Sequence, residues 1–152
     1  MSVSAPSLEK SRVFESKIVI DASLIDSYGH MNNSKYLEVL ENARWDIISQ
    51  RGFGPADIAK HGLGPVVLEV NLRFTKEIKL AEKIKIVSYI EMTNANGTPV
   101  EKSKTMTMVQ SMINEAEDVC CAARFVFGLF DLKARKLVLP TPEWLRAAGV
   151  TD

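Results

Sequence analysis

The sequence predicts an α+β domain in which a long helix packs on a largely antiparallel sheet of about five or six strands. One helical pattern, over residues 34–50, stands near the start of the chain. Most of the chain after residue 64 alternates between apolar and polar residues, which is the pattern of half-buried strands. A strand also precedes the helix, so the expected order is strand, long helix, short helix and four or five mostly sequential strands.

The first expected strand covers residues 12–21, where Phe14, Ile18 and Ile20 stand at even spacing. In the helix that follows, apolar residues recur three or four positions apart and form one stripe. These residues are Tyr36, Leu40, Ala43 and Ile47, with Leu37 and Ile48 beside them. Gly52 supplies a stop for this helix, and Gly54-Pro55 begins the short helix.

The strands of the second half are separated by recognisable turn sequences. Asn96-Gly97 is a strong tight-hairpin signal, and the polar run 114–118 separates the two longest strands. We expect strands over residues 66–74, 84–90, 100–113, 119–132 and 136–140, and a terminal helix over 142–149. Residues 1–11 are polar and are expected to be a flexible N-terminus, which leaves residues 12–152 as a single domain.

Composition excludes several classes of function. Lys plus Arg and Asp plus Glu number 19 each, so the net charge is zero, and no basic stripe predicts a nucleic-acid partner. No run approaches the ~18 apolar residues of a membrane span, and the N-terminal residues lack the apolar core of a signal peptide, so we expect no membrane insertion and a cytoplasmic location. Cys120 and Cys121 are expected to be free thiols, and no Cys/His spacing predicts a metal site.

The least ordinary stretch is "DSYGHMNNSKY", residues 26–36. Its Asp, Ser, Gly and Asn residues are favoured in turns, and an asparagine or Ser34 can cap the following helix, so a turn with a cap is a complete structural explanation. A functional interpretation is also open. The free N–H groups of a helix start can hold an oxygen that gains negative charge, and the Asp26 carboxylate would lie close by. That combination suits attack on an acyl group.

These residues resemble a known family. Asp26, Gly29, His30, the two asparagines and Tyr36, followed by "ENAR" at 41–44, are similar to the D-x-x-G-H-V-N-N-x-x-Y…E-x-A-R signature of hot-dog-fold acyl-CoA thioesterases. The nearest branch is the 4-hydroxybenzoyl-CoA thioesterase-like one. The resemblance implies a hot-dog fold that hydrolyses an acyl-CoA or acyl carrier protein thioester without a metal or cofactor. It also implies a homodimer or homotetramer with each site between protomers.

The resemblance assigns roles to individual residues. Asp26 matches the catalytic aspartate, as nucleophile or as general base, and the backbone N–H of Asn33 matches the group that polarises the thioester carbonyl. Gly29, Asn32 and Tyr36 are expected to form the substrate site. Many relatives carry a second aspartate where this chain has Leu24, a departure that removes a polar neighbour but leaves Asp26. His30 has either a direct catalytic role or a structural hydrogen bond in the loop.

Other features leave alternatives open. Glu41 and Arg44 stand at i, i+3 and are expected to form an ion pair on the helix, with a catalytic glutamate as the alternative. Four lysines, Lys76, Lys79, Lys83 and Lys85, are either solvated or bind the coenzyme A phosphates. A non-catalytic acyl-CoA binding module of the same fold is the rival function. An enoyl-thioester hydratase is a third hypothesis, although its usual local motif is not found.

Overall fold

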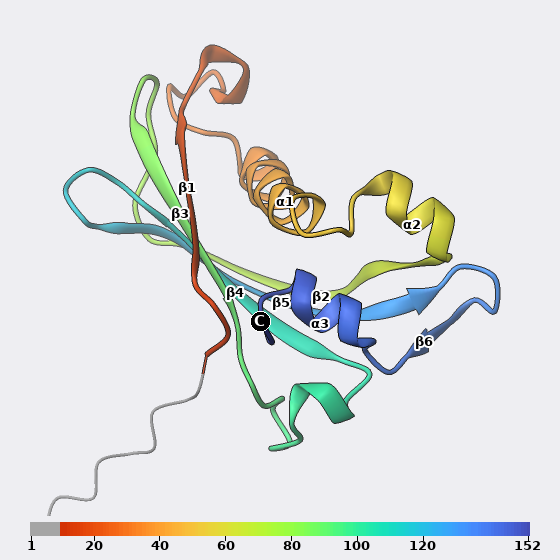
Figure 1. Cartoon of the computed structure of the whole chain (residues 1–152). Coiled ribbons are helices and arrows are strands. Elements are labelled where there is room, and N and C mark those ends of the chain that lie inside the picture. The colour runs from red at the N-terminus through yellow and green to blue at the C-terminus, as the bar shows by residue number, and fades with distance from the viewer. Residues whose placement is uncertain (1–9) are drawn as a thin grey trace, which may run out of the picture.

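The computed structural model describes residues 10–152, and they form one antiparallel sheet that curves around a long helix, α1 (Figure 1). The six strands are β1 (Phe14–Val19), β2 (Leu63–Phe74), β3 (Lys83–Ile90), β4 (Met106–Ile113), β5 (Val119–Asp131) and β6 (Lys136–Val138). Their order is β1-β3-β4-β5-β2, and β6 pairs with β5. This arrangement confirms the predicted α+β class and the antiparallel sheet.

The helices are α1 (Asn33–Ser49), α2 (Pro55–His61) and α3 (Pro142–Ala147), with short 3₁₀ turns η1 (Ala22–Leu24) and η2 (Val100–Lys102). As predicted, α1 buries an apolar stripe against the sheet, but Leu37, which was expected beside that stripe, is 40% exposed. Its buried residues are Tyr36, Val39, Leu40, Ala43 and Ile48. The stripe therefore ends on Ile48, while Ile47 is only half buried.

The core divides into two apolar clusters along α1. The cluster under the N-terminal half of the helix includes Met31, Tyr36 and Leu40, packed against Ile84 and Phe125. The cluster under the C-terminal half joins other parts of the sheet to α3, and its largest members are Phe53, Phe127 and Trp144. Packing along the whole helix therefore fixes the position of its N-terminal end, where the candidate catalytic residues lie.

The segment between β3 and β4 differs from the prediction. Asn94 and Gly97 do form a tight turn, in which Gly97 has φ +78° and its N–H donates to the Asn94 carbonyl at 2.9 Å. The turn stands beyond the strand ends, however, and a strand over residues 100–113 is wrong. Val100 is fully buried in the turn η2, and β4 begins only at Met106. Burial of this one side chain outweighs the strand pattern of its neighbours.

The described chain joins the sheet at Lys10, which forms an isolated bridge with Glu91. Ser11 is buried, and its N–H donates to the Ile90 carbonyl at 2.8 Å, while its Oγ accepts from the Ile90 N–H at 2.7 Å. Residues 10 and 11 thus differ from the flexible terminus expected over 1–11, and residues 1–9 lie outside the described part of the chain.

The two sheet edges have different characters. The β1 edge exposes Val13 and Val19 but also carries charged residues such as Lys17, which discourage pairing with another strand. The β2 edge instead leaves Val67, Leu68, Val70 and Phe74 exposed at 45% to 47%. Apolar side chains along an unpaired edge are typical of a strand that a second chain covers.

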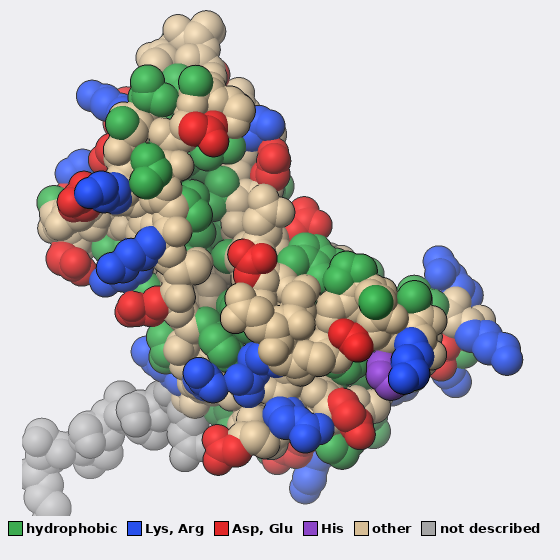
Figure 2. Space-filling view, turned by 45° about the horizontal axis from the view of Figure 1, so that its top comes forward, with side chains coloured by type: hydrophobic (Ala, Val, Ile, Leu, Met, Phe, Trp, Pro, Cys, Tyr) green, Lys and Arg blue, Asp and Glu red, His purple; other side chains and the backbone are tan. Residues whose placement is uncertain are grey.

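Basic and acidic side chains are interspersed over the face shown in Figure 2, in keeping with the zero net charge. Among residues 10–152, no helix combines the length and the apolar character needed to cross a membrane. Cys120 and Cys121 are both buried and free, as predicted.

Candidate active site

The stretch 26–36 forms a closed loop that leads directly into α1. Ile25 and Met31 form an isolated antiparallel bridge, and the Asp26 N–H donates to the His30 carbonyl at 3.0 Å. At the tip, the Gly29 N–H donates to the Asp26 carbonyl at 3.1 Å. Gly29 has φ +84°, a backbone conformation that favours glycine. A Cβ at this position would meet nothing within 4 Å, so lack of space is not the reason for the glycine.

Two further hydrogen bonds anchor the loop to the rest of the domain. The Met31 N–H donates to the Ile78 carbonyl at 2.8 Å, and the Asn32 N–H donates to the Leu24 carbonyl at 3.1 Å. The Met31 side chain is fully buried in the core. The loop is therefore held against both η1 and the segment before β3, and it presents its polar side chains from a fixed backbone.

One of the two oxygens of the Asp26 carboxylate accepts a hydrogen bond from within the loop. Its Oδ1 accepts from the Tyr28 N–H at 2.9 Å, and its side chain is 19% exposed. Its Oδ2 lies 3.9 Å from His30 Nδ1, which is too long for a hydrogen bond. Among residues 10–152, no donor reaches Oδ2 within hydrogen-bond distance, so this oxygen is available to a substrate or a water molecule.

His30 lies beside Asp26 without being bonded to it. Its Nδ1 is 3.2 Å from the Met31 carbonyl oxygen, to which it donates when it carries the proton. The Tyr28 ring lies nearly parallel to the imidazole, with 11° between the planes and 6.0 Å between centroids. The local contacts therefore satisfy the structural alternative for His30, and they leave its Nε2 free.

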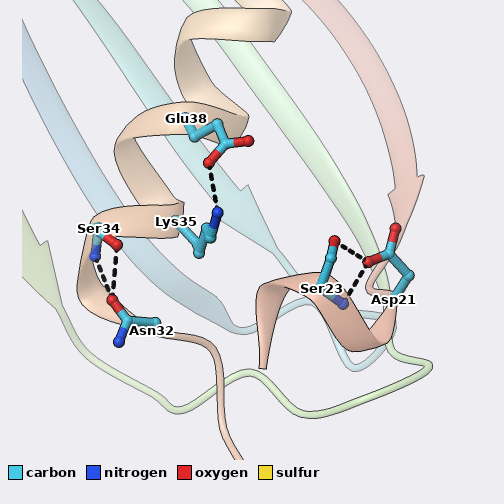
Figure 3. A network of polar contacts seen from close by, with 6 residues as sticks. All are labelled: Asp21, Ser23, Asn32, Ser34, Lys35 and Glu38. Carbon is cyan, nitrogen blue, oxygen red and sulfur yellow. Dashed lines mark hydrogen bonds and ion pairs between the residues drawn. The ribbon is translucent and has the colours of Figure 1, made fainter. Parts of the chain in front are cut away.

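The N-terminus of α1 supplies a free backbone N–H close to Asp26 in the sequence. Asn32 is the N-cap, and its side-chain oxygen accepts from both the N–H of Ser34 at 2.9 Å and its hydroxyl at 2.8 Å (Figure 3). The Asn33 N–H, next along the chain, has no acceptor among the described residues. A free N–H at the positive end of a helix dipole is a site for a developing oxyanion.

Asn32→Ala is expected to lower the free energy of unfolding by about 1 kcal/mol, because it removes the side-chain acceptor that caps α1. Urea denaturation followed by circular dichroism measures the change. Asn42→Ala, at an exposed position within the same helix, is the matched control and should cost less. Equal losses in the two variants would show that the cap contributes nothing special.

Tyr36 faces inward from the first turns of α1. It is 3% exposed and meets the Phe74 ring edge-on, with 4.8 Å between centroids. Burial raises the pKa of the Tyr36 phenol to about 12, so the hydroxyl stays protonated at neutral pH and cannot act as a base. The Tyr36 ring therefore packs the start of α1 against the last residue of the edge strand β2.

The predicted Glu41–Arg44 ion pair is wrong, since no such contact lies within 4 Å. Glu41 instead accepts from Trp45 Nε1 at 3.4 Å. Arg44 turns inward, where its guanidinium donates to Gln110 Oε1 at 3.0 Å and lies 4.1 Å from the Phe125 ring centroid. Burial lowers the pKa of Arg44. Gln110 was not predicted from the sequence, because its only signal there is an amide between the inward-facing methionines of β4.

The lysine candidates for a phosphate site are mostly engaged within the chain. Lys76 pairs with Asp118 at 2.6 Å, Lys79 with Glu77 at 3.2 Å and Lys85 with Glu117 at 3.5 Å. The solvated alternative therefore describes these three side chains better than a preformed anion site does. The structure brings Asp26, Gly29, His30, Asn32 and Asn33 together in one loop, with Tyr36 behind them.

Residues 21–149 match the family model described as the thioesterase-like superfamily. The long-chain acyl-CoA thioesterase FadM of Escherichia coli (strain K12) is 29% identical over 126 residues, which cover 80% of this chain and 86% of FadM. The residues matched by the family model include the loop over residues 26–36 and the strands β2 to β6.

Solved structures give the same answer for the fold. The probable thioesterase YbaW from Escherichia coli is 25% identical with a TM-score of 0.69, over 88% of this chain and 94% of that one. The Staphylococcus aureus protein SAV2348, in complex with CoA, has a TM-score of 0.78 at 11% identity, over 93% and 84%. The DHNA-CoA thioesterase from the same species has 0.72 at 22%, over 89% and 87%. These likenesses confirm the predicted hot-dog fold.

Proposed function

This chain belongs to the thioesterase-like superfamily, and from that membership we propose that Asp26 and the backbone N–H of Asn33 together hydrolyse an acyl-CoA thioester. The activity is that of an acyl-CoA thioesterase, which converts the thioester to a free acid and a thiol. One observation supports the residue assignment above the others. A backbone hydrogen bond from Asp26 to His30 closes the loop that leads directly to the free N–H of Asn33.

The chemistry follows from the two groups. The thioester carbonyl oxygen accepts from the Asn33 N–H, and the helix dipole stabilises the negative charge that grows on it. Asp26 Oδ2 either takes a proton from a water whose oxygen attacks the carbonyl carbon, or attacks that carbon itself. The carbon–sulfur bond then breaks and releases the thiolate, which takes the proton held by Asp26 in the first case and a proton from solvent in the second. In the second case, water afterwards hydrolyses the anhydride formed on Asp26.

The neighbouring residues support this reaction. Gly29 gives the loop the tight turn that carries Asp26, and Asn32 holds the first turn of α1 so that the Asn33 N–H stays free. His30 lies beside the free oxygen of Asp26, with 3.9 Å between Nδ1 and Oδ2. Tyr36 closes the inner side of the substrate site.

The proposed assembly is a homodimer formed through β2, or a homotetramer made of two such dimers. The apolar side chains along the β2 edge supply the surface that a second copy would cover. A two-fold axis makes the two edges run antiparallel, so the first half of one β2 meets the second half of the other. Two free, buried cysteines fit a reducing compartment, which supports a cytoplasmic location.

Purified protein is expected to release coenzyme A from acyl-CoA, as measured by the appearance of free thiol across a panel of acyl chain lengths and aryl thioesters. The long-chain specificity in the name of FadM makes long chains the first to test. Acyl carrier protein thioesters form a second panel. Loss of the enoyl absorbance of crotonyl-CoA without thiol release would indicate a hydratase. Binding without any thiol release would indicate a binding module.

A further inference from the structure

The basic side chains of this chain are unevenly distributed, although its net charge is zero. Figure 2 shows Lys and Arg side chains gathered at one end of the molecule, where Figure 1 places α2 and the hairpin that joins β5 to β6 (right in both views). The Leu132 N–H donates to the Gly62 carbonyl at 2.8 Å, which ties this hairpin to the end of α2. We call residues 57–62 and 131–136 together the basic lobe.

The permanent cations of the basic lobe lack carboxylate partners. Among residues 10–152, none of them lies within 4.0 Å of a carboxylate oxygen, whereas basic side chains elsewhere, such as Lys76 and Arg124, are paired. These cations are all exposed, and they are Lys60, Lys133, Arg135 and Lys136. The lobe therefore presents positive charge that no neighbouring side chain neutralises.

The two carboxylates of the basic lobe bind its own backbone. Asp57 Oδ2 accepts from the Gly54 N–H at 2.9 Å at the start of α2. Asp131 Oδ1 accepts from the N–H groups of Ala134 and Lys133, both at 2.9 Å, and the Ala134 bond is the main cause that lowers the pKa of Asp131. With four permanent cations and two carboxylates, the lobe keeps a net positive charge in a chain that has none overall.

An apolar side chain stands among these cations. Leu132 is 41% exposed at the hairpin turn, directly before Lys133. The Arg135 guanidinium lies 5.0 Å from the Phe130 ring centroid, so this charge also lies over apolar surface. The stems of Lys and Arg cover apolar surface while their charged ends stay in water. An exposed leucine flanked by basic side chains is typical of a surface that lies at the interface of an anionic membrane.

We propose that the basic lobe binds the surface of a membrane that contains anionic lipid, with its cations among the phosphate groups and Leu132 in the apolar boundary beneath them. Lysine is depleted in protein–protein interfaces, and three of the four lobe cations are lysines, which favours lipid over an acidic protein. The lobe lies beyond Leu63, the first residue of β2, and so outside the strand edge proposed as the interface between copies. This contact is independent of the proposed hydrolysis.

The purified full chain is expected to sediment with vesicles made of equal parts of phosphatidylcholine and phosphatidylglycerol, and not with vesicles of phosphatidylcholine alone. Binding should weaken as salt is added, because salt screens the attraction between charges. Each cation near an anionic surface contributes about fivefold to the partition coefficient, so Lys60→Gln combined with Lys133→Gln should weaken binding about 25-fold. Equal binding to both kinds of vesicle, or binding to neither, would overturn the proposal.

Matched controls carry the same substitutions outside the basic lobe. Lys17→Gln combined with Lys83→Gln removes two exposed cations of β1 and β3 and should leave vesicle binding unchanged. Leu132→Ser should weaken binding about tenfold, because it removes the apolar part of the contact. Leu80→Ser, at a residue that is 56% exposed, should not. Parent-like binding by the lobe variants, or an equal loss in the controls, would contradict the proposal.

Soluble competitors separate a membrane surface from other sources of negative charge. Glycerophosphate and free coenzyme A carry phosphate without a bilayer, and neither should displace the protein from vesicles when added at the phosphate concentration of the lipid. Displacement by either would make the lobe a site for free phosphate and overturn the proposal. Polyglutamate stands for an acidic protein and should bind more weakly than the anionic vesicles. Tighter binding of polyglutamate would indicate a protein partner instead.

Discussion

Asn in place of Asp26 is expected to lower kcat for acyl-CoA hydrolysis by about a hundredfold to ten-thousandfold, with little change in stability. The asparagine oxygen can still accept the Tyr28 N–H, so the loop keeps its conformation. The variant carries an uncharged NH₂ group in place of Oδ2, however, and Oδ2 is the oxygen that the loop leaves free. It can neither take a proton from water nor attack the carbonyl carbon.

The control for Asp26→Asn is Asp46→Asn, which makes the same change at an exposed position on α1. Steady-state kinetics with matched circular dichroism spectra should show a full effect at residue 26 and none at residue 46. A parent-like kcat in folded Asp26→Asn would remove Asp26 from the mechanism. Single turnover in ¹⁸O-labelled water separates the two routes, since only a nucleophilic carboxylate transfers one of its own oxygens to the acid.

The loop over residues 26–36 was predictable because its structure is local. A cap residue, a glycine with positive φ and an aspartate that accepts from the N–H two residues later are all decided within a few positions of the chain. The helix stripe was predictable for a similar reason, since its period follows from the 3.6-residue turn. The sequence therefore located the candidate catalytic group and the free N–H before any tertiary contact was known.

The predictions that were wrong concern contacts between distant parts of the chain. Nothing near Arg44 in the sequence points to Gln110, which lies 66 residues away and draws the guanidinium inward instead of toward Glu41. The turn at Val100 likewise depends on a buried position supplied by the rest of the domain. The contact of α3 with α1 and β2 through Trp144 has the same origin, because these elements meet only in the folded chain.

Val70→Lys is expected to separate the assembly into single chains and to lower kcat/KM by about a hundredfold or more. Val70 is 46% exposed in the middle of the β2 edge, so a lysine there costs the isolated chain little. Across a two-fold axis, each new ammonium would lie near its symmetry mate and lose water on docking, which destabilises the pair. A single chain would keep Asp26 and Asn33 but lose the second copy, which the family resemblance implies is part of each site.

Val19→Lys is the matched control, because Val19 is 60% exposed on the opposite edge strand, β1. Analytical ultracentrifugation should give the mass of a single chain for Val70→Lys and the parent mass for Val19→Lys, with activity following mass. An assembled Val70→Lys protein would exclude β2 as the interface. A monomeric but fully active one would show that the reaction needs only one copy, since the loop, the helix start and the acyl site would then all belong to a single chain.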